Sequence, residues 1–268
     1  MANAILRRFV AELTEQRGLV GEAEVVWLQA PGRPVVYLHG VPTDADDWTP
    51  FLEQTGGFAP DLPGFGRSSK RGDLDFTMDG LGNFVEAFAD ARRLDRLSLV
   101  MHDWGVAGML FAMRAPERIE RIVLIDAVPL LPGYRWHRTA RMWRRRFVGE
   151  VLMGFTSERT LARAVPDLKP RARVVAQRFD QGTQRAVLQL YRSASEDALA
   201  RAGEQLSRIT CPALVLWGED DPYIPSSFAH AYADTLPNAT AEVVSGAGHW
   251  PWLQRPELVQ TVTGFLER

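Results

Sequence analysis

The sequence predicts an α/β fold in which a mostly parallel, doubly wound sheet carries an inserted helical segment. Short apolar runs rich in Val, Leu and Ile recur along the chain, with helix-like segments between them. This alternation is typical of parallel strands that are covered on both faces. It stops between about Pro129 and Ser207, where helical segments follow one another without a strand. A chain of 268 residues is long enough for one large domain with such an insertion.

Six apolar runs are expected to form strands: Ala23–Gln29, Pro34–Gly40, Leu97–Asp103, Arg121–Ala127, Ala213–Glu219 and Ala241–Ala247. Helical periodicity predicts helices at Met78–Leu94 and Pro256–Arg268. Within the insertion, His137–Phe155 is expected to be helical, as are several shorter segments after it. The chain therefore divides into a core formed by residues 1–128 and 208–268, and a helical cap formed by residues 129–207.

Composition excludes several classes of partner. A net charge of −2 argues against nucleic acid as the main partner, and the basic stretch Arg138–Arg146 is interpreted as the solvated face of a helix. No apolar run reaches the roughly 20 residues of a membrane helix, so no membrane partner is expected. The segment Met1–Leu13 lacks the apolar run of a signal peptide, which favours a cytoplasmic location. The single cysteine, Cys211, excludes an intramolecular disulfide.

A strand, a sharp turn and a helix are expected around Asp103. The strand ends in the motif MHDWG (Met101–Gly105), and a helix-like segment, Val106–Ile119, follows it. This layout is typical of a nucleophile elbow, in which serine normally occupies the position of Asp103. An aspartate, with an ordinary pKa of about 3.9, is ionised at neutral pH and needs no base before it attacks. It therefore suits an electrophilic alkyl carbon rather than an acyl group.

The other chemical motifs follow in a recognisable order. The first strands lead to HGVP at His39–Pro42 and to a Gly- and Pro-rich loop at Pro60–Ser69, and WGEDDP and GAGHWP come after the last two strands. A nucleophile, an acid and a histidine in this order resemble the α/β-hydrolase superfamily over nearly the whole chain. HGVP together with HDWG is similar to the branch that contains epoxide hydrolases and haloalkane dehalogenases.

The resemblance implies a catalytic triad. Asp103 would be the nucleophile, His249 the general base that activates a water, and Asp221 the acid that orients the histidine. Asp126, at the end of the strand after the elbow, is an alternative acid, because some relatives take the acid from that position. The product of the first step would be an ester between Asp103 and the substrate.

The resemblance also implies an oxyanion hole formed by the backbone N–H groups of Val41 and Trp104. No cofactor and no metal are expected. The partners are a small apolar electrophile, either an epoxide or a haloalkane, and water.

The two reactions differ in the leaving group. An epoxide hydrolase must protonate an alkoxide, and the resemblance implies that cap tyrosines, or a tyrosine and a histidine, do so. Tyr191 is the best candidate, with Tyr134 or His137 as its partner. The sequence favours this reaction over dehalogenation.

A haloalkane dehalogenase must instead bind a halide. The resemblance implies that the indole N–H of Trp104 would do so, with Trp143 or Trp136 of the cap as a second donor. Val41 occupies the position where one dehalogenase subgroup has an asparagine donor. A third hypothesis is a ligand-binding member of the fold without catalysis, but every triad position is filled, which favours an enzyme.

Overall fold

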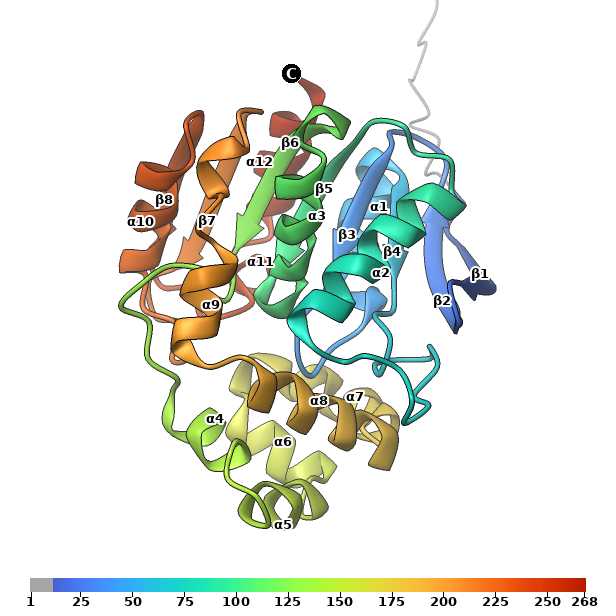
Figure 1. The fold of residues 1–268 in the computed structure, drawn as a ribbon, viewed down its shortest axis with the longest axis vertical. Coiled ribbons are helices and arrows are strands. Elements are labelled where there is room, and N and C mark those ends of the chain that lie inside the picture. Colours follow the sequence, from blue (N-terminus) through green and yellow to red (C-terminus); the bar gives the residue numbers. More distant parts are fainter. Residues whose placement is uncertain (1–11) are drawn as a thin grey trace, which may run out of the picture.

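The computed structural model describes residues 12–268 and contains an eight-stranded sheet with the strand order β1-β2-β4-β3-β5-β6-β7-β8. Strands β3 to β8 pair in parallel, whereas β1 pairs with β2, and β2 with β4, in antiparallel fashion. The predicted fold class is thus confirmed (Figure 1). Residues 1–11, which make up most of the N-terminal segment discussed above, lie outside the described residues.

The strands are β1 (Thr14–Val20), β2 (Ala23–Ala30), β3 (Val35–Leu38), β4 (Gly57–Pro60), β5 (Leu97–His102), β6 (Ile119–Ile125), β7 (Ala213–Gly218) and β8 (Ala239–Val244). Each of the six predicted runs overlaps a strand, although β6 and β8 begin and end earlier than predicted. The sequence did not reveal β1, which is mostly exposed at the sheet edge, or β4, which has only four residues. Neither contains the long Val, Leu and Ile run by which the other strands were found.

Six helices cover the two faces of the sheet: α1 (Thr49–Thr55), α2 (Met78–Ala91), α3 (Gly108–Arg114), α10 (Ser227–Thr235), α11 (Pro251–Gln254) and α12 (Glu257–Glu267). Apolar residues of α2, α3 and α10 pack with one face of the sheet, and those of α1, α11 and α12 with the other. In β5, Leu99 and Met101 face the first group and Val100 the second. This alternation explains why the central strands are apolar throughout.

The helix expected to continue to Ile119 is shorter than predicted. Helix α3 ends at Arg114, and Pro116 begins a single 3-10 turn before Ile119 starts β6. Proline lacks an N–H and disfavours a helical conformation in the residue before it, which explains this early end.

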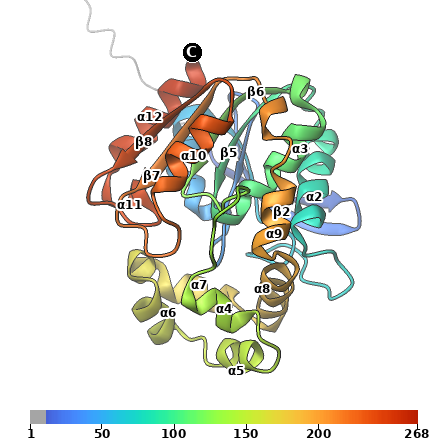
Figure 2. The ribbon, with the colours of Figure 1, turned by 60° about the vertical axis from the view of Figure 1, so that its left-hand side comes forward.

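Between β6 and β7 lie the helices α4 (Arg138–Trp143), α5 (Val148–Gly154), α6 (Glu158–Ala164), α7 (Ala172–Arg178), α8 (Gln181–Ser193) and α9 (Glu196–Ala202). Helices α4 to α8 form a group at the end of the sheet toward which the parallel strands point (Figures 1 and 2). The helical stretch expected at His137–Phe155 is broken in two, because Phe147 has a positive φ of 66°.

Buried ion pairs connect α7 to the loop that follows β3. Arg178 Nη1 lies 2.6 Å from Asp44 Oδ2 and 2.7 Å from Asp46 Oδ2, and Arg171 pairs with Asp47. Asp44 and Asp47 are both buried. Because breaking a buried ion pair leaves an uncompensated charge, these contacts hold the inserted helices over the ends of the strands.

Candidate active site

Asp103 lies in a strained turn at the end of β5. Its φ is +49°, which is rare for a residue with a side chain and places the carboxylate at the strand end. Two glycines make the turn possible. A Cβ on Gly40 would lie 2.4 Å from Asp103 Oδ2, and one on Gly105 would lie 2.2 Å from the Leu38 carbonyl oxygen.

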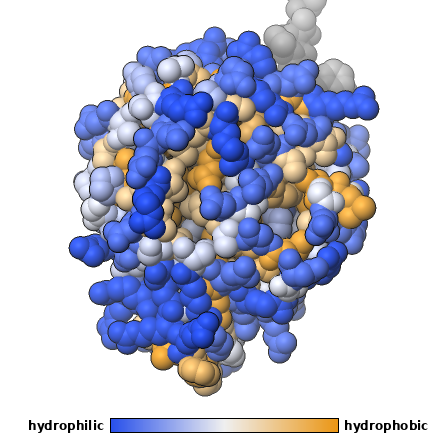
Figure 3. Space-filling view, viewed as in Figure 1, coloured by the Kyte–Doolittle hydropathy of each residue, from blue (hydrophilic) through white to orange (hydrophobic). Residues whose placement is uncertain are grey.

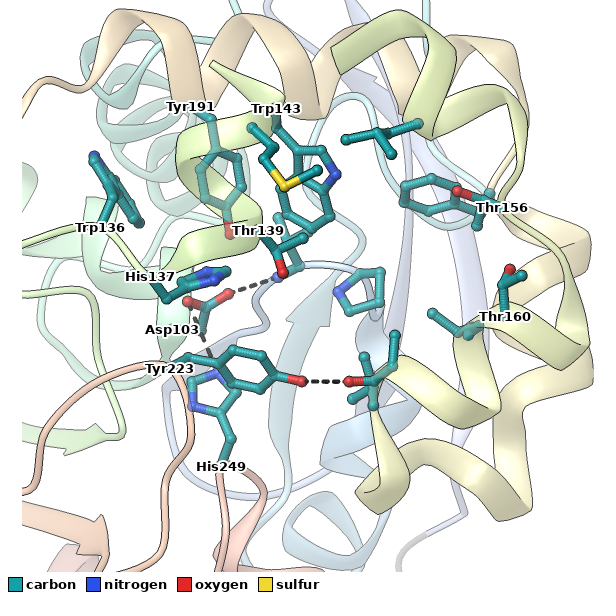
Figure 4. Close-up of a pocket in the computed structure, with 18 of the residues that line it drawn as sticks. Asp103, Trp136, His137, Thr139, Trp143, Thr156, Thr160, Tyr191, Tyr223 and His249 are labelled. Carbon is teal, nitrogen blue, oxygen red and sulfur yellow. Dashed lines mark hydrogen bonds and ion pairs between the residues drawn. The ribbon is translucent and has the colours of Figure 1, made fainter. Parts of the chain in front are cut away.

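The three side chains predicted as a triad lie together. Two of them, Asp103 and His249, line a cavity (Figure 4). His249 Nδ1 is 2.7 Å from Asp221 Oδ2, and His249 Nε2 is 3.9 Å from Asp103 Oδ1. The other oxygen of Asp221 accepts hydrogen bonds from the backbone N–H groups of Tyr223 and Ile224, at 2.7 and 3.1 Å. Asp221 is thus fixed by the backbone and in turn orients the imidazole ring.

Asp126, the alternative acid, is not the carboxylate bonded to His249. It directly follows β6, and its Oδ1 accepts a 2.9 Å hydrogen bond from the Gly218 N–H, while Asp221 takes the place beside the histidine. Burial, followed by the nearby charge of Asp221, raises the pKa of Asp126 well above its ordinary value. This shift favours the protonated form of the Asp126 carboxyl group.

Asp126, Asp221 and His249 offer ligand atoms within 4.8 Å of one another. The Nδ1 atom of His249 is already bonded to Asp221, however, and the Asp126 carboxyl is held by Gly218. This arrangement fits a charge-oriented histidine better than a metal centre.

The electrostatics of the triad follow from burial and from the proximity of the three groups. Burial raises the pKa of Asp103 to about 6, although His249 and the N–H groups of Val41 and Trp104 oppose the rise. For His249, burial alone would lower the pKa, but the carboxylates of Asp221 and Asp103 outweigh it and raise the pKa above its usual value. For Asp221, burial alone would raise the pKa, but the nearby charge of His249 and its hydrogen bond outweigh burial, so the pKa of Asp221 is lowered.

The two oxygens of Asp103 have different surroundings. Oδ2 accepts a 2.8 Å hydrogen bond from the Val41 N–H, and the Trp104 N–H also stabilises the carboxylate. Oδ1 faces His249. The two backbone donors predicted for an oxyanion hole thus lie at the carboxylate, and Oδ1 is left as the oxygen that can attack.

A cavity of about 350 Å³ lies above Asp103 and is lined mostly by apolar and aromatic side chains. The tyrosines, the cap tryptophans and the histidine predicted as substrate contacts all line it: Tyr134, Trp136, His137, Trp143 and Tyr191. Its walls come from the inserted helices and its floor from the core. Such a cavity accepts a small apolar molecule and holds its reactive end at the carboxylate.

Two tyrosines, Tyr134 and Tyr191, line the cavity that contains Asp103. The Tyr191 hydroxyl points toward Asp103 (Figure 4), and burial together with the Asp103 charge raises the pKa of Tyr191 well above its ordinary value. The pKa of Tyr134 is raised for the same reasons, and its hydroxyl is buried without a hydrogen-bond partner among residues 12–268. Both hydroxyls therefore stay protonated and can donate to a group that develops negative charge.

His137 is a third polar group in the cavity wall. Its Nδ1 accepts a 3.4 Å hydrogen bond from the Ala140 N–H at the start of α4. Burial, and next the charge of His249, lower the pKa of His137 to about 4. The ring is therefore neutral at pH 7, and its proton resides on Nε2.

The indole of Trp104 is fully buried, stacks on Trp136 with ring centroids 5.4 Å apart and packs edge-on against Tyr191. It is not among the side chains that line the cavity, and its Nε1 has no hydrogen-bond partner among residues 12–268. Trp136 lines the cavity, but its own N–H donates to the Ala194 carbonyl oxygen at 2.9 Å. Trp143 also lines the cavity, and its N–H does not donate to the Ala194 carbonyl oxygen. Among the three tryptophans considered as halide donors, Trp143 is therefore the best placed.

A family model described as the alpha/beta hydrolase family matches residues 35–261. The chain belongs to this family of enzymes. It is 35% identical over 115 residues to a haloalkane dehalogenase of Agrobacterium fabrum, an alignment that spans 38% of each chain. It is 27% identical over 253 residues to a 2-hydroxy-6-oxo-2,4-heptadienoate hydrolase of Pseudomonas putida, which covers 88% of this chain and 89% of that enzyme.

Solved structures show the same fold for this α/β hydrolase. A variant of the haloalkane dehalogenase DatA from Agrobacterium tumefaciens superposes with a TM-score of 0.81 at 21% identity, covering 96% of this chain and 97% of that one. The epoxide hydrolase CorEH superposes with a TM-score of 0.78 at 19% identity, covering 96% and 99%. Because one fold carries many activities, the reaction must be argued from the site.

Among the residues of this hydrolase's site that sequence reasoning missed, Tyr223 lies beside the triad. Its ring packs edge-on against His249 with centroids 5.1 Å apart, and its hydroxyl donates to the Ala164 carbonyl oxygen of α6 at 3.0 Å. Tyr223 thus connects the triad to the inserted helices. Tyr223 could have been found from the sequence, because it lies two residues after the predicted acid Asp221. Thr139, Thr156 and Thr160 also line the cavity, and no motif marked them.

Proposed function

We propose that this α/β hydrolase opens epoxides through an ester formed with Asp103, which a water activated by His249 hydrolyses to a vicinal diol. The observation that carries the proposal is the pair of tyrosines, Tyr134 and Tyr191, which line the cavity above Asp103 and whose raised pKa values keep their hydroxyls protonated. In this proposal residues 129–207 act as a cap over the core formed by residues 1–128 and 208–268, of which 1–11 are outside the described residues.

In the first step, Asp103 Oδ1 attacks an epoxide carbon and the C–O bond of the ring breaks. The departing oxygen takes a proton from a tyrosine hydroxyl, and the tyrosine later regains a proton from solvent. Strain in the three-membered ring favours opening, but a free alkoxide is a poor leaving group in an apolar cavity. Donors that stay protonated until this moment, such as Tyr191, meet that need.

In the second step, His249 Nε2 removes a proton from a water that attacks the ester carbonyl carbon. The carbonyl oxygen is Oδ2, which already accepts the Val41 N–H, so the developing negative charge meets a donor in place. Collapse of the intermediate releases the diol oxygen, which takes the proton from His249. The Asp103 carboxyl group then releases the second proton of the water to solvent, which balances the proton that the tyrosine regains.

Dehalogenation is the second candidate, and the 35% identity over 115 residues to a haloalkane dehalogenase favours it. A halide needs no proton, only N–H donors that face it. Trp143 borders the cavity and could supply one, but the Trp104 indole, which stacks on Trp136, is not among the side chains that line the cavity. A paired assay of a terminal epoxide and a bromoalkane, measuring diol and bromide, separates the two reactions.

The Tyr191→Phe variant should slow the alkylation step with an epoxide by about 5- to 150-fold, the cost of about 1–3 kcal/mol for one lost hydrogen bond to a charged group. The ring remains, so its packing against Trp104 should persist. Stopped-flow measurement of the first turnover checks this result. Trp143→Phe is the matched control, because it removes a cavity N–H and keeps an aromatic ring.

Under the proposal, Trp143→Phe leaves epoxide opening within a few-fold of wild type. The opposite pattern, in which Tyr191→Phe has no effect on epoxides and Trp143→Phe abolishes bromide release, would make the protein a dehalogenase.

The alkylation rate should fall as the pH falls through about 6. Asp103 attacks only when ionised, and burial raises its pKa to about 6, so each further pH unit below this value should cost nearly tenfold in rate. Single-turnover rates measured from pH 4.5 to 8, in steps of about half a pH unit, test this expectation. A rate that stays constant down to pH 4.5 would mean that Asp103 is not the nucleophile.

A further inference from the structure

The charge of the chain is divided unevenly between its two parts. Residues 129–207 contain fifteen Arg and Lys residues and seven Asp and Glu residues, a net charge of +8. Because the whole chain carries −2, the remaining residues carry −10. The inserted helices thus form the positive end of a strongly polar molecule, and an anionic surface would attract that end and repel the other.

The far end of the inserted helices carries exposed apolar side chains. Phe147 is 83% exposed, Phe155 71%, Val151 58% and Val148 41%, and all four lie on or directly beside α5. We call this group the α5 tip. Figure 3 shows apolar residues at the bottom of the molecule, where Figure 1 places α5. A cluster of this kind on a monomer's surface commonly marks an interaction site.

The backbone conformation at the tip adds to this indication. Phe147 has a φ of +66°, a left-handed conformation that is a strained outlier for a bulky residue. The turn is fixed by hydrogen bonds from the Gly149 N–H to the Arg145 carbonyl oxygen and from the Val151 N–H to that of Phe147. The strained turn therefore presents the phenyl ring of Phe147 to solvent. Burial of this ring against residues 12–268 does not offset the strain.

The tip is continuous with the cavity of the proposed active site. Phe155 belongs to the tip and also lines the cavity. The neighbouring Thr160, which is exposed, lines the cavity too, whereas Asp103 and His249 lie buried at its floor. The cavity thus opens beside the α5 tip, and an apolar molecule leaving a surface in contact with the tip would meet its mouth.

The charges around the tip select the kind of partner. Arg145 and Arg146 directly precede Phe147 and are exposed, as is Arg159 on α6. The nearest acidic side chain in sequence, Glu150, is paired with Arg192 at 2.8 Å. Two copies of the chain joined tip to tip would bring like charges together. Anionic lipid headgroups offer opposite charge to the arginines and an apolar layer to the phenyl rings.

We propose that the α5 tip docks on an anionic lipid surface, with Phe147 and Phe155 in the apolar layer and the flanking arginines on the headgroups. The contact is peripheral, since no helix within residues 12–268 has the length and apolar character needed to cross a bilayer. It departs from the sequence-based expectation of no membrane partner. The inference goes beyond the proposed reaction and does not depend on it.

Sedimentation with lipid vesicles tests the proposal. Vesicles of equal parts phosphatidylcholine and phosphatidylglycerol should bind the full chain, with binding that weakens as salt is added, and pure phosphatidylcholine vesicles should bind it at least tenfold less. The double variant Phe147→Ser/Phe155→Ser should lose at least tenfold in binding to the anionic vesicles. Val151→Ser, at a second exposed position of the tip, should weaken binding in the same direction and serves if the double variant unfolds.

Leu19→Ser is the matched control, because Leu19 is 72% exposed on β1, in the negatively charged part of the chain, and its loss should leave vesicle binding unchanged. The proposal is overturned if anionic vesicles do not bind the protein, or if the tip variants and Leu19→Ser behave alike. It is also overturned if the tip substitutions dissolve a dimer seen by analytical ultracentrifugation while vesicle binding persists. Diol formation from a water-soluble epoxide is measured separately, so failure of docking and failure of the proposed reaction are distinguishable.

Discussion

Asp103→Ala should abolish epoxide turnover, with a loss on the order of 10⁴-fold or more, while the protein remains folded. The expectation follows from the geometry of the elbow. Oδ1 of Asp103 is the carboxylate oxygen that faces His249 at the floor of the cavity, and the neighbouring Asp126 is held by Gly218. Without Asp103 no ester forms, and His249 has no intermediate to hydrolyse.

The same variant should become more stable at neutral pH. A buried carboxylate whose pKa is raised to about 6 holds its proton more tightly when folded than when unfolded, so its ionisation above pH 6 destabilises the fold. A shift of about 2 pKa units corresponds to about 3 kcal/mol, which Asp103→Ala would recover at pH 8 and not at pH 3. Urea unfolding at the two pH values, together with a diol assay, measures both effects.

Asp126→Asn is the matched control, since Asp126 is also a buried aspartate with positive φ at a strand end. The amide oxygen of an asparagine can accept the same hydrogen bond from the Gly218 N–H, so turnover should change only a few-fold. Substantial turnover by Asp103→Ala, or an equal loss in Asp126→Asn, would contradict the role of Asp103.

Much of this arrangement was predictable from the sequence, because motifs at strand ends converge when parallel strands share an edge. The elbow around Asp103 and the histidine after the last strand are local patterns, and the fold brings them together. The resemblance to the family favoured Asp221 over Asp126, but the residues themselves left both open, because each follows a strand and their carboxylates lie within 4.8 Å of each other. In the structure His249 Nδ1 is bonded to Asp221, whereas Asp126 accepts from the Gly218 N–H.

The side-chain contacts of the inserted helices could not be predicted from the sequence either. Trp104 follows the nucleophile directly, yet adjacency in sequence does not determine which way an indole points, and this one stacks on Trp136. Phe147 interrupts a predicted helix through its positive φ, although neither it nor the residues on either side of it are proline or glycine. Such outcomes depend on how neighbouring helices pack, which local propensity does not encode.

His249→Gln has the second large expected effect, because it separates the two steps of the reaction. Asp103 is ionised without help from a base, so the variant should still form the ester. Hydrolysis should then stall, since glutamine cannot remove a proton from water. The loss of His249 also removes an interaction that lowers the pKa of Asp103, so the reaction should be run at pH 8 or above, where the carboxylate is ionised.

The measurement that tests the central claim most directly is the intact mass of His249→Gln after mixing with a terminal epoxide. Ring opening leaves the oxygen on the adduct, so the protein should gain the full mass of one epoxide molecule, on the peptide that contains Asp103. A bromoalkane would instead add only its alkyl group in place of a proton. An unmodified Asp103 in a folded His249→Gln protein, under conditions where wild type turns the epoxide over, would contradict the ester mechanism.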